Sequence, residues 1–316
     1  MTRDLFHPDR THDAARVLGV YEWLRPIMPR PVPAVSRHAT RLRDILEQFD
    51  ALFLDGYGVL NVGADMVPEA DLMLAAAAAA GVEIIVVTNG ASKKSTVTAA
   101  RYRNLGLTIT NQQVVSSRDA LEARLQHPDT GFRRLGVIDS FSSLPTLPGG
   151  EAVILTPDDP VAWHAVDAIG FFGATRWNED WQACLEDAAA TGIPVLVANP
   201  DVAAPHADGL TYEPGFWASL ARHRLGERIV LEWYGKPHRP IFDQAMKALE
   251  QNTGRTNWNS DRIAMVGDTL HTDILGGSGA GLQTVLITGH GLFRDGSAAD
   301  AIAETGIAPN YIVDTV

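Results

Sequence analysis

Short apolar segments of strand length alternate with segments of helix length over most of this 316-residue chain. The clearest run has strand-like ALFLD (51–55), a helix pattern over 68–80, strand-like VEIIVVT (82–88) and a second helix pattern over 93–105. Apolar residues in uninterrupted runs indicate strands that are buried on both faces. This β-α-β-α order predicts an α/β fold with a parallel sheet and right-handed crossovers.

The middle of the chain repeats this alternation as a unit of its own. Its strand-like segments are RRLGVID, EAVILT, VDAIGFFG and IPVLVAN, and its helix-like segments are EDWQACLEDAAAT and GFWASLARHRLG. After it come helix-like KPHRPIFDQAMKALEQ, strand-like RIAMVGD, helix-like TDILGGSGAG and strand-like LQTVLIT. Because the chain is long for a single core, we expect two domains. We assign residues 48–108 and 231–316 to a core domain and residues 109–230 to an inserted α/β domain.

The first 47 residues are expected to be an N-terminal extension that packs on the core. Within it, RPIMPRPVPAVS is rich in proline and is expected to run over the surface, whereas RHATRLRDILEQF has a helical pattern.

Composition excludes several classes of function. A formal net charge of −12 argues against non-specific nucleic-acid binding, and an anionic substrate would need a locally positive pocket. The single cysteine, Cys184, excludes an intramolecular disulfide and a cysteine-based zinc cluster. The N-terminus has no apolar signal core, and no apolar run is long enough to span a membrane. We therefore expect a cytoplasmic protein without nucleic-acid or membrane partners.

A carboxylate follows the first buried strand. In FLDGYGVLNVG, Asp55 comes directly after ALFL, and Gly56 and Gly58 let the chain bend sharply beyond it. Strand ends of this kind are where open α/β sheets build their sites. An isolated Asp-Gly after a strand is nevertheless most often a simple polar turn.

Other polar residues occupy corresponding positions later in the chain. Thr88 ends the second strand, Lys236 opens the helix after the insertion, and MVGDTLHTD places Asp268 at a third strand end with Asp273 five residues later. Three carboxylates, a lysine and a hydroxyl fit a Mg²⁺-assisted attack on a phosphoryl group. Taken singly, Thr88 could cap a helix, Lys236 could be solvated, and the two aspartates could be a helix N-cap and first-turn pair. Their joint occurrence in order favours a site.

These four segments resemble, in order, the four motifs of the haloacid dehalogenase superfamily of aspartate-nucleophile phosphohydrolases. GKPHRPIF and GDTLHTDILGGSGAGLQTVLITGHG are similar to its type IIA branch of sugar-phosphate, phosphoglycolate and p-nitrophenyl-phosphate phosphatases. Only 33 residues separate Asp55 from Thr88, but 148 separate Thr88 from Lys236, which is where this branch carries its cap domain. The segments VVSSRDALEARL and VLVANPD also resemble the branch. The resemblance covers about residues 48–294 and implies a Rossmann-like parallel-sheet core with an inserted α/β cap.

The resemblance also implies roles for individual residues. Asp55 would be the nucleophile and a metal ligand, Asp268 the second metal carboxylate, and Asp273 a support of the metal site through a water or a hydrogen bond. Thr88 and Lys236 would hold the phosphoryl group, and Mg²⁺ would be the cofactor. The stretch ANPDVAAPHADGLTYEPG lines the pocket opening in relatives, although an ordinary polar loop is an equal alternative. The residues expected to bind substrate are Gly56, Tyr57, Asn89, Gly90, Asn199, Asp201 and His206. Relatives often pair through their caps, so a homodimer is expected.

Tyr57 departs from the pattern of the phosphatases. They generally carry a second aspartate at this position, which acts as general acid and base, whereas this chain has Asp-Gly-Tyr. The backbone carbonyl of the residue, a metal ligand in the family, survives the change. Since general acid–base help is worth about 10²–10⁴-fold, weak turnover of alkyl phosphates is expected. The Tyr57 hydroxyl, His238 and His271 are candidate replacements, although a solvent-facing position is the more ordinary expectation for each histidine.

Two other functions remain open. Asp-x-Tyr is also similar to the 2-haloacid dehalogenases, which use the same aspartate on carbon. These enzymes need no metal and carry their cap between the first and second motifs, so Asp268, Asp273 and the long second insertion favour a phosphatase. The third interpretation is a catalytically weak protein that binds a phosphorylated metabolite.

Overall fold

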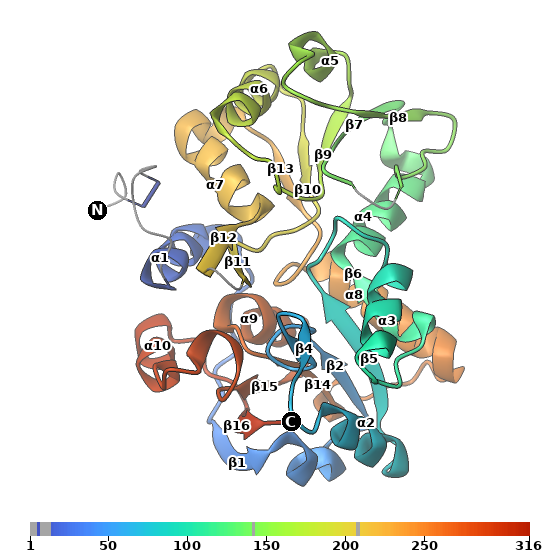
Figure 1. The fold of residues 1–316 in the computed structure, drawn as a ribbon, viewed down its shortest axis with the longest axis vertical. Helices are drawn as coiled ribbons and strands as arrows, with labels where there is room; N and C mark the ends of the chain where they lie inside the picture. Colours follow the sequence, from blue (N-terminus) through green and yellow to red (C-terminus); the bar gives the residue numbers. More distant parts are fainter. Residues whose placement is uncertain (1–4, 7–13, 141–142, 207–208) are drawn as a thin grey trace. The chain divides into compact units, whose positions relative to one another are not determined.

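A computed structural model describes residues 5–6, 14–140, 143–206 and 209–316. The protein forms two compact units, and the chain enters and leaves each of them several times (Figure 1). Unit 1 comprises Met1–Pro26, Asn89–Lys94 and Ser116–Gly235, and unit 2 comprises Ile27–Thr88, Ser95–Val115 and Lys236–Val316.

Unit 2 is built on a seven-stranded sheet with the order β1-β16-β15-β14-β2-β5-β6, in which the neighbours from β1 to β5 pair in parallel. Its strands are β1 (Arg37–Arg41), β2 (Ala51–Leu54), β5 (Glu83–Thr88), β6 (Val114–Ser116), β14 (Ile263–Gly267), β15 (Gln283–Ile287) and β16 (Tyr311–Thr315), with a small antiparallel pair β3 (Asn61–Val62) and β4 (Asp65–Met66). Its helices are α2 (Ala70–Ala79), α3 (Ser95–Asn104), α8 (Arg239–Thr253), α9 (Leu275–Gly279) and α10 (Ala298–Thr305). The α/β fold with a parallel sheet is therefore confirmed.

The central strand β2 shows why the apolar runs are uninterrupted. All four of its residues are buried, because both faces of the sheet are covered. On one face, Leu52 and Leu54 share a core cluster with Met73 of α2 and Tyr102 of α3. The intervening Phe53 points to the opposite face and is equally inaccessible.

The strand order reverses at β2. The chain continues from β2 to β5 on one side, whereas β14, which follows much later, pairs on the other side. Such a reversal leaves a crevice outside the carboxyl ends of the strands, where open α/β sheets bind ligands. The ends of β14, β2 and β5 carry Asp268, Asp55 and Thr88.

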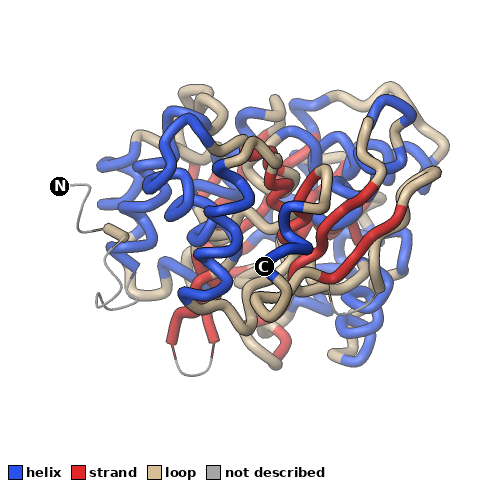
Figure 2. The backbone as a smooth tube through the Cα atoms, turned by 90° about the horizontal axis from the view of Figure 1, so that it is seen from above, coloured by secondary structure: helices blue, strands red, loops and turns tan. Residues whose placement is uncertain are grey.

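Unit 1 contains a second parallel sheet, with the order β13-β10-β9-β7-β8. Its strands are β7 (Arg134–Ile138), β8 (Glu151–Ile154), β9 (Ala168–Phe171), β10 (Val195–Val197) and β13 (Leu231–Trp233), and its helices are α1 (Ala14–Leu24), α4 (Ser117–Gln126), α5 (Pro160–His164), α6 (Glu179–Ala190) and α7 (Pro214–Leu225). Residues of α5, α6 and α7 pack on β9 and β10 around the buried Trp163. A hairpin of β11 (Ala203–His206) and β12 (Gly209–Tyr212) projects as a narrow pair of strands (Figure 2).

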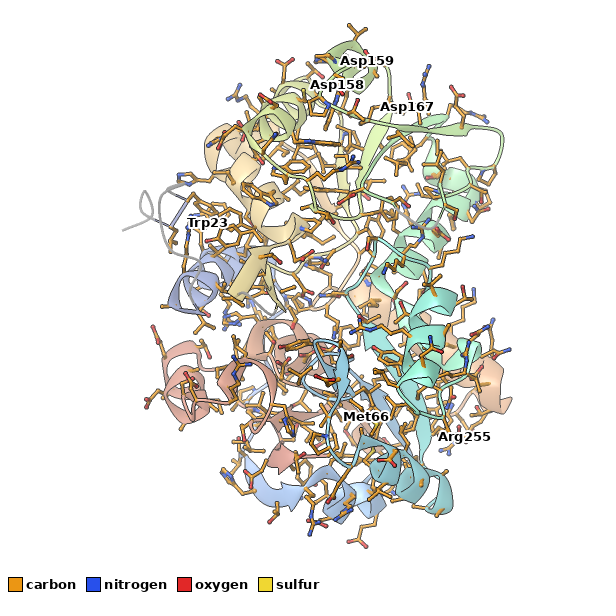
Figure 3. The ribbon with its side chains drawn as sticks, in the orientation of Figure 1. Trp23, Met66, Asp158, Asp159, Asp167 and Arg255 are labelled. Atoms are coloured by element: carbon orange, nitrogen blue, oxygen red, sulfur yellow. The ribbon has the colours of Figure 1, made fainter. Side chains whose placement is uncertain are left out.

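The N-terminal extension differs from the prediction, because its described parts divide between the two units. In unit 1, the buried guanidinium of Arg16 on α1 lies over the rings of Tyr212 and Phe216, 5.1 and 5.3 Å from their centroids. Phe6 stacks on His223 and meets Trp23 edge-on, the latter a side chain of α1 (Figure 3). Aromatic and cation–π packing of this kind fixes the segment on unit 1.

The helical pattern predicted over 37–49 is wrong for its first five residues. Arg37–Arg41 form strand β1, which pairs with β16 at the edge of the unit 2 sheet, and only Leu42–Gln48 form a 3₁₀ helix. The free edge of β16 offers backbone partners that outweigh a local helical preference. The proline-rich segment before it runs along unit 2 as predicted for a surface strap, with Val32 N–H donating to Ser278 Oγ at 2.8 Å and Val35 exposed.

None of the helices in the described residues combines the length and apolarity needed to cross a membrane.

Candidate active site

Asp55 lies just beyond β2, and its carboxylate is held on one side. Its Oδ1 accepts hydrogen bonds from the backbone N–H of Gly56 and from Lys236 Nζ, both at 2.7 Å. Its Oδ2 takes part in neither bond, and the side chain keeps 15% of its surface exposed. The carboxylate is thus oriented through Oδ1, and part of its surface stays accessible.

Lys236 joins two carboxylates at the start of the segment that leads into α8. The side chain is 2% exposed, and its Nζ also lies 2.7 Å from Asp273 Oδ1. Burial alone would lower the pKa of Lys236, but the charges of Asp273 and Asp55 raise it above its ordinary value. The lysine is therefore a fixed positive charge at neutral pH.

Asp268 follows β14 and is enclosed by backbone. Its Oδ2 accepts from Leu292 N–H at 2.9 Å, and its Oδ1 accepts from Thr269 Oγ1 at 3.1 Å. Gly58 and Gly291, both at positive φ, press so closely on this carboxylate that a Cβ at either position would collide with it; at Gly58 it would lie 2.7 Å from Asp268 Cγ. Only glycine fits at these two places.

Burial and mutual repulsion perturb the carboxylates. Burial, and then the charge of Asp55, raise the pKa of Asp268 to about 7. Burial also raises the pKa of Asp273 well above its usual range, opposed by Lys236 and reinforced by Asp55 and Asp268. One ammonium cannot balance three carboxylates in so little space, so the cluster favours a further positive charge.

The cluster fits a divalent metal ion. One oxygen from each of Asp55, Asp268 and Asp273 lies within 4.8 Å of the other two. Oxygen ligands are those that Mg²⁺ and Ca²⁺ prefer. Both oxygens of Asp273 accept hydrogen bonds, from Lys236 and from Thr269 N–H, and the charged donor Lys236 engages Asp273 in a way that has no counterpart at Asp268 among the described residues. Asp273 is placed to hold the lysine and to support the site.

Comparisons with known proteins bear on the same parts of the chain. A family model described as "Haloacid dehalogenase-like hydrolase" matches residues 52–138, and one described as "HAD-hyrolase-like" matches residues 233–316. Together the two matches include Asp55, Thr88, Lys236 and both later aspartates. The chain belongs to the haloacid dehalogenase superfamily.

Similar proteins of this superfamily are phosphatases by name. The chain is 27% identical to glycerol-3-phosphate phosphatase of Rattus norvegicus over 311 residues, which is 90% of this chain and 94% of that protein. It is 25% identical to dihydroxyacetone phosphatase of Corynebacterium glutamicum, with 82% and 86% covered. A solved structure from Cytophaga hutchinsonii, described as a possible sugar phosphatase, superposes with a TM-score of 0.74 at 25% identity and covers 89% of this chain and 98% of that one.

Tyr57 is the residue predicted to replace the second aspartate of the superfamily phosphatases. The residue is half-buried and forms a β-bridge with Asn61. Burial raises the pKa of its hydroxyl and the charge of Asp268 adds to this, while the guanidinium of Arg294, which hydrogen-bonds the phenol, opposes it. The phenol therefore stays protonated at neutral pH.

The two candidate histidines differ from expectation. His271 is completely buried, so the solvent-facing position expected for it is wrong. It lies in the π-helical turn Leu270–Ile274, whose five residues are all buried. His238 is half-buried, and burial lowers its pKa to about 4, so it is neutral at neutral pH and carries no proton to donate as an imidazolium.

The remaining predicted residues belong to unit 1, apart from Thr88 and Gly56. Asn89 and Asp201 are hydrogen-bonded to each other, and Asn199 is bonded to Glu213. Gly90 is exposed in the short segment after Thr88. His206 ends strand β11, but its side chain lies outside the described residues.

Several contacts at the site carry no recognisable sequence signal. Leu292 acts through its backbone N–H, and Tyr102 of α3 brings its hydroxyl against the backbone of Gly56, where no side chain would fit. Burial first, and then the charge of Asp55, raise the pKa of Tyr102. Gly291, the second glycine of GHG, lies within the segment that resembles the family. Only the fold shows that Gly291 packs against the Asp268 carboxylate.

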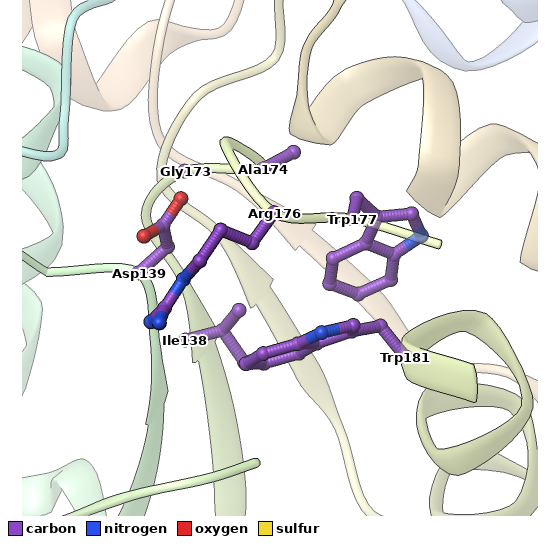
Figure 4. Close-up of a pocket in the computed structure, with 7 residues that line it drawn as sticks. All are labelled: Ile138, Asp139, Gly173, Ala174, Arg176, Trp177 and Trp181. Carbon is purple, nitrogen blue, oxygen red and sulfur yellow. The ribbon is translucent and has the colours of Figure 1, made fainter. Parts of the chain in front are cut away.

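Two other hollows are not comparable sites. A cavity of about 10 Å³ in unit 1, beside Asp139, Arg176 and Trp177, has room for about one water (Figure 4). A groove of about 390 Å³ in unit 2 lies at the opposite, amino-terminal edge of β2. Its arginines, Arg262 and the labelled Arg255 (Figure 3), are paired with Asp50 at 2.6 and 3.3 Å.

Proposed function

We propose that this chain is a Mg²⁺-dependent phosphohydrolase that acts on a small phosphorylated metabolite through an aspartyl-phosphate. The observation that carries the proposal is the state of Asp55. One of its oxygens is fixed by Lys236 and Gly56 N–H, its side chain remains 15% exposed, and a second acidic metal donor, Asp268, lies beside it. A nucleophile needs this combination of orientation and charge compensation.

The reaction divides into two displacements. In the first, Asp55 Oδ2 attacks phosphorus, a bond from this oxygen to phosphorus forms, and the ester P–O bond breaks with departure of the alcohol oxygen. In the second, water attacks phosphorus, the bond to Asp55 breaks, and inorganic phosphate leaves. Lys236 and the Thr88 hydroxyl would hold the phosphoryl oxygens, with backbone N–H groups of Asn89 and Gly90. A bound Mg²⁺ would neutralise charge on the phosphoryl oxygens and on the two aspartates.

The relatives support a small substrate. Two of them are named for dihydroxyacetone phosphate and glycerol 3-phosphate, which are three-carbon phosphate esters. We therefore propose a small sugar or polyol phosphate, with unit 1 acting as the cap that recognises it and unit 2 as the catalytic core. A homodimer through residues 109–230 and a cytoplasmic location remain predictions.

Beryllofluoride tests the nucleophile directly. With Mg²⁺, the wild type should give a bound ¹⁹F resonance, because beryllofluoride mimics a phosphoryl group on a carboxylate. Asp55→Asn should lose this resonance and reduce phosphatase activity by about 10⁴-fold or more. The exposed Asp71→Asn is the matched control and should keep both. A bound resonance that survives Asp55→Asn refutes the assignment.

Product analysis separates the phosphatase from a dehalogenase. The proposal requires release of phosphate from phosphate esters that depends on Mg²⁺ and on Asp268. Halide release from a 2-haloacid at a comparable rate, unaffected by chelation of divalent metal, would instead support the dehalogenase.

Tyr57 predicts which substrates turn over well. Without the usual aspartate, an alkoxide leaving group lacks its proton donor, whereas p-nitrophenolate departs without one. We therefore propose weak activity that favours aryl phosphates. Tyr57→Asp should raise turnover of glycerol 3-phosphate by about 10²-fold, the lower end of general-acid effects, and that of p-nitrophenyl phosphate by much less. Tyr57→Phe is the control. Equal gains on both substrates, or none, would show that position 57 is not an empty acid position.

A further inference from the structure

Asn89 and Asp201 make a buried contact within unit 1. Asn89 is 3% exposed, and its Nδ2 donates to Asp201 Oδ1 at 2.8 Å. The backbone carbonyl of Asn89 accepts from Ser117 Oγ, also at 2.8 Å. Both the side chain and the main chain of Asn89 are thus tied to unit 1.

The loop that carries Asp201 is itself fixed. Asn199 Oδ1 accepts from Asp201 N–H at 3.0 Å, and Asn199 Nδ2 donates to Glu213 Oε2 at 3.1 Å. Gly215 N–H, in the first turn of α7, donates to the Asp201 carbonyl at 3.0 Å. Three hydrogen bonds therefore hold the backbone of Asp201 and the side chain of Asn199 in place.

This loop meets the chain at two of the places where it passes from one unit to the other. Asn89 is the residue directly after Thr88, and Gly235 is the residue directly before Lys236. Gly235 packs so tightly on Asn89 Oδ1 and on Pro200 that a Cβ could not be accommodated. Each of the two residues proposed to hold the phosphoryl group is therefore one peptide bond away from the contacts of the loop Asn199–Asp201.

We propose that Asp201 and Asn89 are a positioning pair, which sets the backbone after Thr88 and does not itself bind the substrate. This inference rests on the proposed phosphatase function, and it replaces the expectation that both side chains contact the substrate. Charge favours it, because a carboxylate would repel an anionic phosphate ester but is a strong acceptor for an amide N–H. Misplacement of a catalytic group by about 1 Å can reduce activity by about 10²-fold, so such a pair matters even without touching the substrate.

The test exchanges the two partners. Asp201→Asn keeps an acceptor oxygen for Asn89 but removes the charge, and Asp201→Leu removes the acceptor. Asn89→Asp places two carboxylates opposite each other, and the double variant Asn89→Asp with Asp201→Asn restores the hydrogen bond in the reverse direction. The exposed Asp180→Asn on α6 is the matched control.

We expect kcat on p-nitrophenyl phosphate to fall by about 10²-fold in Asp201→Leu and in Asn89→Asp, with KM changed less than about threefold. Asp201→Asn should stay within about threefold of the wild type, and the double variant should recover most of the loss caused by Asn89→Asp. A substrate-binding role predicts otherwise: Asp201→Asn would raise KM strongly, and the double variant would recover nothing. That result overturns the proposal.

Hydrogen–deuterium exchange of residues 89–94 gives a readout that does not depend on turnover. Asp201→Leu and Asn89→Asp should accelerate exchange in this segment, and the double variant should restore protection. If wild-type enzyme hydrolyses no phosphate ester, the proposed function fails while this pattern still reports on the pair. Unchanged exchange in Asp201→Leu overturns the positioning role whatever the activity.

Discussion

Each unit contains a carboxyl group whose pKa is raised by burial, but the groups that surround the two carboxyls differ. In unit 2, Asp268 is buried beside Asp55 and its pKa is raised to about 7. In unit 1, burial first, and then the charges of Asp201 and Asp139, raise the pKa of Glu213 to about 7 as well. The first cluster contains a buried ammonium, Lys236, whereas the Glu213 carboxylate accepts a hydrogen bond from the neutral amide of Asn199.

This difference shows what each region is built to hold. In unit 2, oxygens of three carboxylates lie within 4.8 Å of one another, and one lysine cannot balance their charge. A dication would therefore stabilise this cluster. Amide hydrogen bonds do not compensate a full charge, but they fix direction, so the unit 1 network is suited to holding a loop in place. Similar pKa values therefore accompany a cluster proposed to bind a metal ion in one unit and a hydrogen-bond network in the other.

Removing Lys236 is the strongest way to break this comparison. Lys236→Met leaves Asp55 and Asp273 without their shared counter-ion in a buried site. Loss of one partner of a buried ion pair typically destabilises a protein by about 3–5 kcal/mol. We expect a decrease of this size in the free energy of unfolding, measured by urea titration without metal, together with loss of activity.

Two further variants separate charge from packing at this position. Lys247→Met on the exposed face of α8 should change stability by less than about 0.5 kcal/mol. Lys236→Met combined with Asp273→Asn should recover part of the stability, because one uncompensated charge is gone, but none of the activity. A single Lys236→Met variant as stable as the wild type would mean that the lysine does not balance the two acids.

Metal binding tests whether the unit 2 cluster is stabilised by an added positive charge. At a Mg²⁺ concentration 100 times its Kd, binding to the folded state should stabilise the wild type by about 2.7 kcal/mol. Asp268→Asn keeps an oxygen for Leu292 N–H but loses the ligand charge, so this stabilisation should disappear. Thermal unfolding with and without Mg²⁺ measures the effect, and Asp71→Asn should retain it. Persistence of the full Mg²⁺ stabilisation in Asp268→Asn would place the metal elsewhere.

Sequence reasoning predicts those parts of the fold that depend on local patterns. Runs such as ALFLD and VEIIVVT fix buried strands, and Asp55 and Asp268 lie together because parallel strands of one sheet end at one edge. The matches to the superfamily confirm that assignment of family.

Features that depend on tertiary partners could not be predicted in this way. Arg37–Arg41 becomes a strand only because the edge of β16 is available. Helix α1 in unit 1 was not expected, since Arg16 lies over the rings of Tyr212 and Phe216, which are far away in sequence. The orientation of the Asp268 carboxylate depends on the backbone N–H of Leu292, a donor that every non-proline residue possesses.

Glu213 gives the smallest expected effect and tests the unit 1 side of the comparison. Because its pKa is raised in the folded state, folding opposes its ionisation. Below the unfolded pKa of about 4.5, this group does not reduce the stability of the protein. As the pH rises from about 4.5 to about 7, its ionisation destabilises the folded state progressively. Glu213→Gln preserves an acceptor for Asn199 and cannot ionise. Since Glu213 is only partly buried, we expect the variant to be more stable than the wild type by about 1–2 kcal/mol at pH 8.

The pH dependence distinguishes this explanation from a general effect of the substitution. Thermal unfolding at pH 5 should show little difference between Glu213→Gln and the wild type, because the carboxyl is then largely protonated in the folded protein. The gap should open between pH 5 and pH 8, whereas the exposed Glu227→Gln should show no such trend. A constant difference at both pH values would trace the effect to packing. If Glu213→Gln is instead less stable than the wild type at pH 8, a positively charged group must balance the Glu213 carboxylate. The two units would then not differ in how their buried acids are compensated.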